Sequence, residues 1–301
     1  IGSKYMKNKI LLGYFFIIGT AFFTAFSYIF GKKISDSLYP ETVAFYWFFG
    51  AFLVAVFKRF FFTALGFKFK VPLSDLGKYK KIMILSSIVT VFGAASWVIA
   101  LRIIGPPATS FLMKFQVLFA VILGVFFLKE RLSKTEVLGI FLTIIGGSLI
   151  TFNNTRIELI GSFYAISAAF FYSILFIIVK KTASDLNMIM VATLRSTGVV
   201  IIGFFYLIIF NKFQIPNLND FIMILLGGTC GAFIGKAFQF QAIKLVDVSR
   251  TTAITPLEAV FVVYLSYIYF DTIPDYFKLA GGFLIIAGVF ILLLFRKDNI
   301  N

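Results

Sequence analysis

Long apolar segments separated by short polar connections recur along the whole chain. A run of about 20 apolar residues has the length that crosses the hydrocarbon core of a bilayer as a helix. Alternating ten-residue segments, which are typical of membrane β-barrels, are absent from the sequence. The pattern predicts ten helical spans, at residues 10–31, 40–62, 80–103, 106–128, 134–152, 159–180, 187–210, 219–243, 248–270 and 275–295.

The composition supports the same interpretation. Apolar residues make up 60% of the chain and charged residues only 14%, whereas a soluble domain carries about 25% charged residues. In hydrocarbon every backbone N–H and C=O needs a partner within the protein, and helices supply that partner internally. We therefore expect an all-α integral membrane protein.

The absence of His and the presence of a single Cys exclude several kinds of site. The chain has no His and one cysteine, Cys230, which excludes an internal disulfide and a metal cluster built from Cys or His. We expect no cofactor. The net charge of +15 lies mostly in the connections between apolar segments, so it is better explained by membrane orientation than by a nucleic-acid partner.

Basic residues in short connections indicate the cytoplasmic side of a membrane protein. With the N-terminus inside, nineteen Lys and Arg residues fall on the inner side. Six fall on the outer side, namely Lys32, Lys33, Arg102, Arg156, Lys212 and Lys278. The ratio predicts a protein of the cytoplasmic (inner) membrane with both termini in the cytoplasm.

The two halves of the chain show internal repetition. Gly13, Phe15, Lys32-Lys33 and Gly50 recur 148 positions later, and Gly93, Ala100, Thr109, Gly139 and Gly146 recur 142 positions later. Residues 6–152 and 153–297 then hold five spans each, so the second half would enter the membrane from the opposite side. Inverted repeats of this kind are typical of alternating-access carriers. Chance matches among apolar residues are the alternative explanation.

The end of each half carries a family resemblance. The first half has the charged turn Lys129-Glu130-Arg131 followed by Gly139 and Gly146-Gly147, and the second has Thr255-Pro256-Leu257-Glu258, Asp271-Thr272, Gly281-Gly282 and Gly288. The chain resembles the ten-helix, EamA-like branch of the drug/metabolite transporter superfamily over almost its whole length. The resemblance implies one membrane domain of two inverted five-helix repeats and specifies a fold more than a substrate. Lys114 stands where many members have Pro.

Four ionisable residues fall inside predicted spans, where a charge is costly and therefore indicates function. They are Lys114, Arg195, Lys236 and Glu258. Together they would give a cavity a net charge of +2, which favours an anionic or zwitterionic solute, since Arg binds carboxylate or phosphate in bidentate fashion and Lys acts as a point charge. The alternative is a structural pair between Lys114 and Glu258, with Arg195 and Lys236 reaching toward the cytoplasmic interface.

Neutral side chains complete the predicted substrate site. Gln116 and Gln239 would add hydrogen bonds, and Trp97, which aligns with Gln239 in the repeat, would stack on a flat solute. Pro256 removes a helix hydrogen bond two residues before Glu258, so it is a candidate gate or hinge. A proton carried by Glu258, or a counter-substrate, would couple the transport.

These observations favour a secondary active transporter for an amino acid or a related polar metabolite. Exchange of a phosphorylated or nucleotide-like metabolite is the alternative within transport, and an exporter of hydrophobic drugs fits a basic interior less well. A lipid-linked transferase within the membrane is the rival class. It would need clustered carboxylates or His, which no connection supplies. A channel is the third option.

Overall fold

The computed structural model describes residues 2–64, 76–128, 133–152, 156–182, 188–235, 238 and 256–294. Lys236 and Gln239, two of the predicted site residues, lie outside these ranges. Within the described residues the regular structure is helical throughout.

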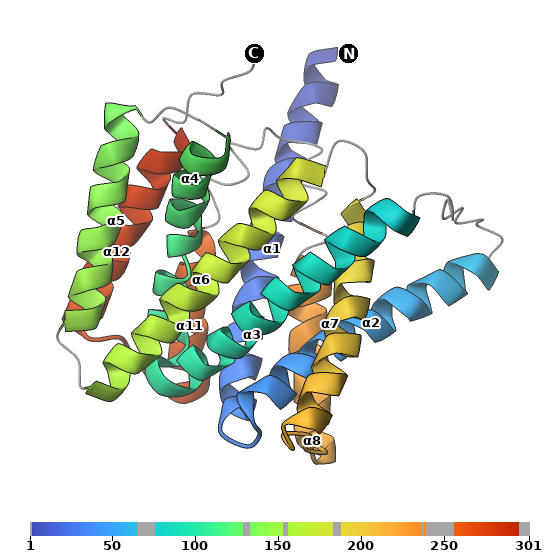
Figure 1. Ribbon diagram of the computed structural model, residues 1–301. Coiled ribbons are helices and arrows are strands. Elements are labelled where there is room, and N and C mark those ends of the chain that lie inside the picture. Colours follow the sequence, from blue (N-terminus) through green and yellow to red (C-terminus); the bar gives the residue numbers. More distant parts are fainter. Residues whose placement is uncertain are drawn as a thin grey trace.

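The helices follow the apolar segments of the sequence (Figure 1). In the first half they are α1 (Gly2–Ser35), α2 (Pro40–Ala64), α3 (Leu76–Leu112), α4 (Phe115–Leu128) and α5 (Lys134–Phe152). In the second half they are α6 (Arg156–Thr182), α7 (Met188–Ile209), α8 (Leu218–Gly228) continuing into a π-helical segment η2 (Thr229–Gly235), then α11 (Leu257–Phe270) and α12 (Tyr276–Leu294).

The outward faces of these helices are apolar. Four helical stretches among the described residues, in α1, α3, α5 and α6, are long and apolar enough to cross a membrane, and six further apolar helices are shorter. Large side chains such as Phe163 and Phe283 are about 70% exposed. A surface of this kind fits lipid as the surrounding solvent.

A sharp turn divides α3 at Gly105. The φ of Gly105 is 72°, a left-handed conformation that glycine adopts without the steric cost of a Cβ. Pro106 and Pro107 follow at the start of the next helical stretch, where their missing N–H groups are tolerated. The predicted spans 80–103 and 106–128 therefore meet at this turn.

Helices from the two halves interleave around one continuous apolar core. The main pairings are α3 with α6, α5 with α12, α2 with α7, α1 with α11, α4 with α6, α3 with α7, and α1 with α8 and η2. In Figure 1 the N-terminal end of α1 and the C-terminal end of α12 lie on the upper side, and α1 and α6 run in opposite directions.

Glycines allow α5 and α12 to approach each other closely. A methyl group added at Gly139 would meet the Gly288 carbonyl oxygen at 2.7 Å, and one added at Gly146 would meet the Gly281 carbonyl oxygen at 2.5 Å. Both distances are shorter than any real contact of that kind. Larger residues at these positions would therefore separate the two helices.

Candidate functional site

A buried ion pair joins the two halves of the chain in the interior of the bundle. The Lys114 Nζ lies 3.1 Å from the Glu258 Oε1, and the two side chains are 8% and 16% exposed. Lys114 lies between α3 and α4, and Glu258 lies in the first turn of α11. A charge in such a place needs an opposite charge nearby, because moving it out of water is costly.

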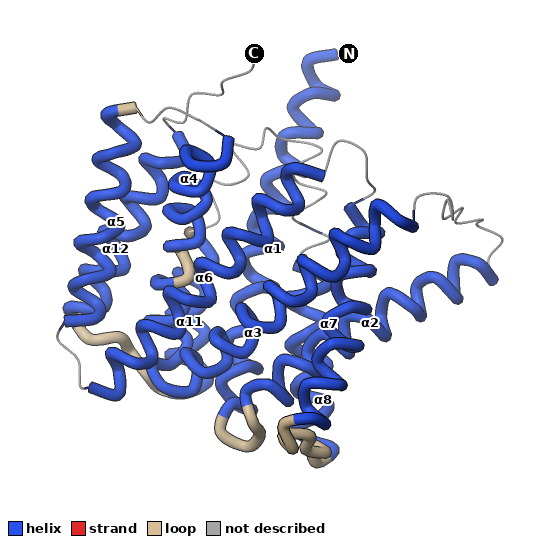
Figure 2. Tube along the Cα trace, in the orientation of Figure 1, coloured by secondary structure: helices blue, strands red, loops and turns tan. Residues whose placement is uncertain are grey.

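Lys114 occupies an interruption in its span. Met113 and Lys114 form a turn, and the backbone N–H groups of Lys114, Gln116 and Val117 each donate to the carbonyl three residues earlier, as in a tight 3₁₀ turn. The turn appears as a short tan segment within the bundle in Figure 2. The sequence pattern predicted one continuous span here, and the structure corrects this to two helices, because the α-helical hydrogen-bond pattern stops at Lys114.

Pro256 stands at the start of α11, two residues before the carboxylate. The Ala259 N–H donates to the Pro256 carbonyl at 3.0 Å, which is again a tight turn. Each member of the buried ion pair is therefore carried by a helix end within the bundle, where backbone groups lack their usual helical partners.

Two aromatic residues continue the cluster from Glu258. The Tyr28 hydroxyl on α1 lies within hydrogen-bonding reach of the Glu258 and Trp97 side chains. The rings of Tyr28 and Trp97 meet edge to face at 5.3 Å, and Trp97 meets Trp47 at 5.4 Å. All three aromatic side chains are buried, so α1, α2, α3 and α11 meet through them.

Arg195 on α7 brings a second positive charge into the interior. Its guanidinium lies 5.5 Å from the centre of the Phe48 ring, and its side chain interacts electrostatically with Tyr172. The Arg195 Nε is buried and has no hydrogen-bond partner among the described residues. A buried N–H donor without an acceptor is costly, so this group is available to an anionic ligand.

A second set of polar contacts lies away from the cluster, along the lower side of Figures 1 and 2, where the α1–α2 and α7–α8 connections lie. Lys212 forms an ion pair with Glu41 at the start of α2. The Thr42 hydroxyl donates to the Lys212 carbonyl, and the Tyr39 N–H donates to the Gln214 side chain at 2.6 Å. The hydrogen bond with Glu41 raises the pKa of Lys212, so Lys212 is charged at neutral pH.

Arg102 forms hydrogen bonds with the α1–α2 connection on the same side. Its guanidinium donates to the carbonyl oxygens of Ser35 and Leu38, and it lies 3.7 Å from the Asp36 carboxylate. At the other edge, the Lys278 ammonium bridges Glu158 and Asp275, each at 3.1 Å. Arg102, Lys212 and Lys278 are three of the six cations that the sequence predicts to be outside.

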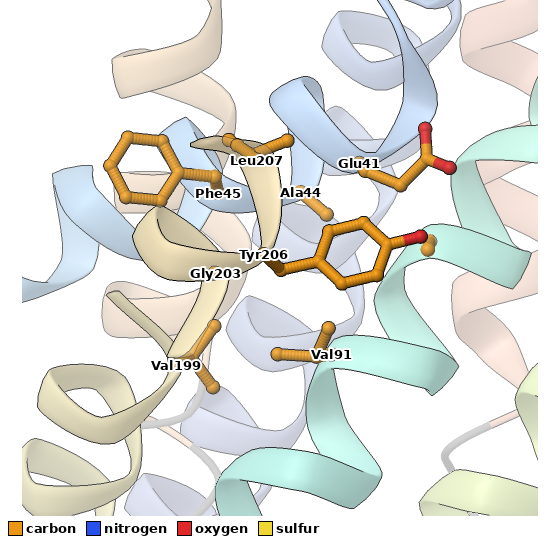
Figure 3. A pocket seen from close by; sticks show the side chains of 9 residues that line it. Glu41, Ala44, Phe45, Val91, Val199, Gly203, Tyr206 and Leu207 are labelled. Atoms are coloured by element: carbon orange, nitrogen blue, oxygen red, sulfur yellow. The ribbon is translucent and has the colours of Figure 1, made fainter. Parts of the chain in front are cut away.

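A small pocket lies beside Glu41, between α2, α3 and α7 (Figure 3). Its wall includes Val91, Val199 and Tyr206, whose ring extends from α7 into the space between α2 and α3. The volume is about 10 Å³, which accommodates one water molecule. This pocket is therefore too small for a metabolite in the present conformation.

One protein family accounts for this helical arrangement. The model of the EamA-like transporter family matches residues 11–152 and again residues 159–294. The chain belongs to the EamA-like transporter family. It is therefore an integral membrane protein and a transporter rather than an enzyme.

Relatives of this EamA-like protein include named transporters. It is 26% identical to an S-adenosylmethionine uptake transporter of Rickettsia conorii, over 72% of this chain and 73% of that protein. It is 28% identical to an S-adenosylmethionine uptake transporter of Rickettsia bellii, over 72% and 74% of the two chains. An uncharacterized transporter of Haemophilus influenzae is 28% identical over 60% of this chain and 62% of its own.

A solved structure supports the fold of this EamA-like chain. The crystal structure of another protein superimposes on this chain with a TM-score of 0.63, at 14% identity, over 95% of this chain and 96% of the other. This likeness establishes the fold alone.

The structure brings most of the predicted site residues of this EamA-like transporter into one cluster. Lys114 contacts Glu258, Trp97 is linked to Glu258 through Tyr28, and the Gln116 amide donates to the Tyr172 carbonyl at 3.4 Å. Tyr172 in turn interacts with Arg195.

Sequence reasoning missed Tyr28 and Tyr172. A buried tyrosine hydroxyl in a membrane span needs a partner, but the sequence does not show which partner the fold supplies. The only signal was that both tyrosines fall inside apolar spans.

Proposed function

We propose that this protein is a secondary active transporter that moves a small polar metabolite, zwitterionic or anionic, across the cytoplasmic membrane by alternating access. The observation that carries the proposal is the buried ion pair of Lys114 and Glu258. Ionisable residues inside a membrane bundle are expensive and typically mark the path of a solute or an ion. Interrupted helices near the middle of the bundle are the usual carriers of such sites in secondary transporters.

The arrangement of the helices supports ten spans in two inverted repeats. If α1–α5 correspond to α6–α12, the pairing of α1 with α11 has its counterpart in α6 with α4, and α3 with α6 in α8 and η2 with α1. The pairings α2 with α7 and α5 with α12 are their own counterparts. The contact of Gly139 with Gly288 likewise corresponds to that of Gly281 with Gly146.

The same correspondence relates the two helix interruptions. Lys114 and Pro256 are 142 positions apart, which is the register of the repeat, and so are Gln116 and Glu258. The solute site would then lie on the axis that relates the two halves. The positive-inside rule assigns the upper side of Figure 1, where the N-terminal end of α1 and the C-terminal end of α12 lie, to the cytoplasm.

S-adenosylmethionine is the first substrate to test. Two relatives are named as its uptake transporters. The two charged ends of its α-amino acid group match Lys114 and Glu258, whereas its sulfonium adds a positive charge that these residues do not pair. Its carboxylate would bind Arg195 or Lys114, its ammonium would bind Glu258, and its adenine would lie against Trp97. Base–aromatic stacking of this kind stabilises nucleobase binding by about 1–3 kcal/mol.

An adenine nucleotide is the second candidate. The unpartnered Nε of Arg195 favours a phosphate, which accepts bidentate hydrogen bonds from arginine. A nucleotide and S-adenosylmethionine share adenine and differ in the charge that meets Glu258. The relative strength with which each compound competes against the other for transport therefore separates the two candidates.

Counterflow in proteoliposomes tests the function. Vesicles loaded with unlabelled S-adenosylmethionine should accumulate the labelled compound transiently and with saturation. Lys114→Ala and Glu258→Gln should each lose at least 90% of this signal. The matched control is Lys278→Ala, which removes a lysine from another ion pair, away from the cluster, and should retain it.

The proposal fails if wild-type vesicles show no saturable counterflow with S-adenosylmethionine, any of the twenty amino acids or adenine nucleotides. It fails equally if both cluster variants transport at the wild-type rate.

A further inference from the structure

We propose that Lys114 and Glu258 exchange partners with a zwitterionic substrate, so that each of them binds one end of an α-amino acid group. This inference rests on the proposed transport function and narrows its substrate class. In the empty carrier the two side chains neutralise each other. In the loaded carrier the substrate carboxylate faces Lys114 and the substrate ammonium faces Glu258.

Charge compensation in a buried place favours this arrangement. With 8% and 16% exposure, neither Lys114 nor Glu258 has enough contact with water to remain charged alone at low cost. A solute with a single negative charge could reach Lys114 only by leaving Glu258 unpaired. An α-amino acid replaces both partners at once, and the number of unpaired buried charges does not change.

The surroundings of the ion pair are asymmetric in a way that also suits a zwitterion. On the acidic side, the Tyr28 hydroxyl lies within hydrogen-bonding reach of Glu258, so the carboxylate keeps a neutral donor when Lys114 turns away. On the basic side, Arg195 offers a second cation with a free donor. The carboxylate of the substrate therefore binds Lys114, with Arg195 as a further cation of the cluster, and its ammonium binds Glu258.

The exchange explains how an empty carrier returns. Lys114 and Glu258 re-form their ion pair once the substrate leaves. A zwitterion of zero net charge leaves the net charge of the interior the same in the loaded and the empty states, whereas the sulfonium of S-adenosylmethionine would add one positive charge. Glu258 then need not take up a proton for the carrier to reset. Glu258 would act by binding substrate rather than by carrying a proton.

A panel of solutes tests the substrate class. Counterflow of S-adenosylmethionine and the twenty amino acids would be compared with that of adenine nucleotides, sugar phosphates and dicarboxylates. Solutes that carry an α-amino acid group should support at least tenfold more counterflow than anions that lack one. Decarboxylated S-adenosylmethionine, which lacks one end, should compete at least tenfold more weakly than the intact compound.

Counterflow with phosphates or dicarboxylates but not with zwitterions would overturn the inference and leave the proposed function standing. Absence of counterflow with every compound would instead overturn the function itself.

A variant series separates substrate binding from proton coupling. In a proton carrier, Glu258→Gln loses net uphill uptake but keeps exchange, because exchange needs no proton. Partner exchange predicts that Glu258→Gln reduces both net uptake and exchange at least tenfold. The double variant Lys114→Gln/Glu258→Gln removes both charges, so it should fold as well as wild type, by size-exclusion profile, and still fail to exchange. Exchange retained in either variant would contradict the inference.

A second inference concerns the conformation of the carrier. We infer that the contacts between residues 210–217 and the start of α2 form an outer clasp that closes the external side of the carrier. The clasp consists of the Lys212–Glu41 ion pair, the Thr42–Lys212 bond and the Tyr39–Gln214 bond. It joins the second half of the chain to the first, and the water-sized pocket of Figure 3 lies directly beside Glu41.

An outward-open state requires the two halves to separate on that side, so the clasp must break once in each cycle. In a Cys230→Ser background, Tyr39→Cys/Gln214→Cys would be joined by a short bifunctional methanethiosulfonate reagent. Counterflow should fall at least tenfold and return when dithiothreitol cleaves the link. The matched control is Glu158→Cys/Lys278→Cys, which joins two positions on the same side but within the second half, and should keep transporting.

Full counterflow by the cross-linked Tyr39→Cys/Gln214→Cys variant would overturn the clasp. Failure of the two cysteines to cross-link at all would also overturn it, because the contact would then be absent in the membrane.

Discussion

Two lysine–carboxylate pairs in this protein have the same distance between their charges and different surroundings. Lys114 lies 3.1 Å from Glu258 in the interior, and Lys278 lies 3.1 Å from Glu158 at the lower edge of the bundle. The interior side chains are 8% and 16% exposed, and those at the edge are 19% and 28% exposed. The distance between the charges is therefore no guide to their roles.

The surroundings decide what each pair does. An exposed ion pair is screened by water and contributes about 0–1 kcal/mol to stability. Removal of one member from a buried pair costs about 3–5 kcal/mol, because the remaining charge has no partner. The Lys114–Glu258 pair joins helix interruptions from the two halves, whereas the Lys278–Glu158 pair joins α12 to α6 within one half. The interior pair is accordingly suited to exchange with a solute, and the edge pair to fastening neighbouring helices.

The largest expected effect comes from breaking the interior pair on one side only. Glu258→Ala leaves the Lys114 ammonium buried and unpaired, and should destabilise the protein by about 3–5 kcal/mol. The double variant Lys114→Met/Glu258→Leu removes both charges and should recover most of that loss while remaining inactive. Thermal unfolding of the purified proteins in one detergent measures the difference. A double variant as unstable as Glu258→Ala would show that the charges are not the cause.

A smaller effect is expected at Arg102. Arg102→Ala removes two hydrogen bonds to the Ser35 and Leu38 carbonyls. Hydrogen bonds from charged donors contribute roughly 1.5–3 kcal/mol each when fully made, and partial exposure reduces this, so a loss of about 1–3 kcal/mol should follow. Arg102→Lys keeps the charge but not the planar fork and should recover less than half of it. Full recovery by lysine would attribute the effect to charge, through Asp36, rather than to the two carbonyls.

The sequence predicted much of this architecture because lipid leaves few alternatives. The all-helical membrane class, the boundary between the predicted spans 80–103 and 106–128, and the family followed from apolar runs, glycines and prolines, since the hydrocarbon thickness and backbone hydrogen bonding restrict the choices. The pairing of Lys114 with Glu258 was foreseen only as the structural alternative to substrate binding. Both interpretations contain that contact, and they differ in whether the ion pair opens for a solute.

Other parts of the site depend on how helices rotate against each other. The positions of Tyr28 and Tyr172 beside Glu258 and Arg195 follow from tertiary packing, and no local pattern encodes them. The interruption at Met113 and Lys114 was also missed. Its residues are apolar or long-chained rather than Gly or Pro, so the helix break has no signal in composition. Lys236 and Gln239 lie outside the described residues and remain predictions.

The smallest effect should come from the edge pair, and it sharpens the contrast with the interior. Lys278→Ala removes contacts with Glu158 and Asp275, and should cost about 0–1 kcal/mol because water solvates the remaining carboxylates. Salt provides the control. The loss caused by Lys278→Ala should shrink at 1 M NaCl, where the Debye length is about 3 Å, whereas the loss caused by Glu258→Ala should not change, because ions do not enter the interior. Equal salt dependence of the two variants would mean that water reaches both pairs, and the distinction between the interior and the edge would be lost.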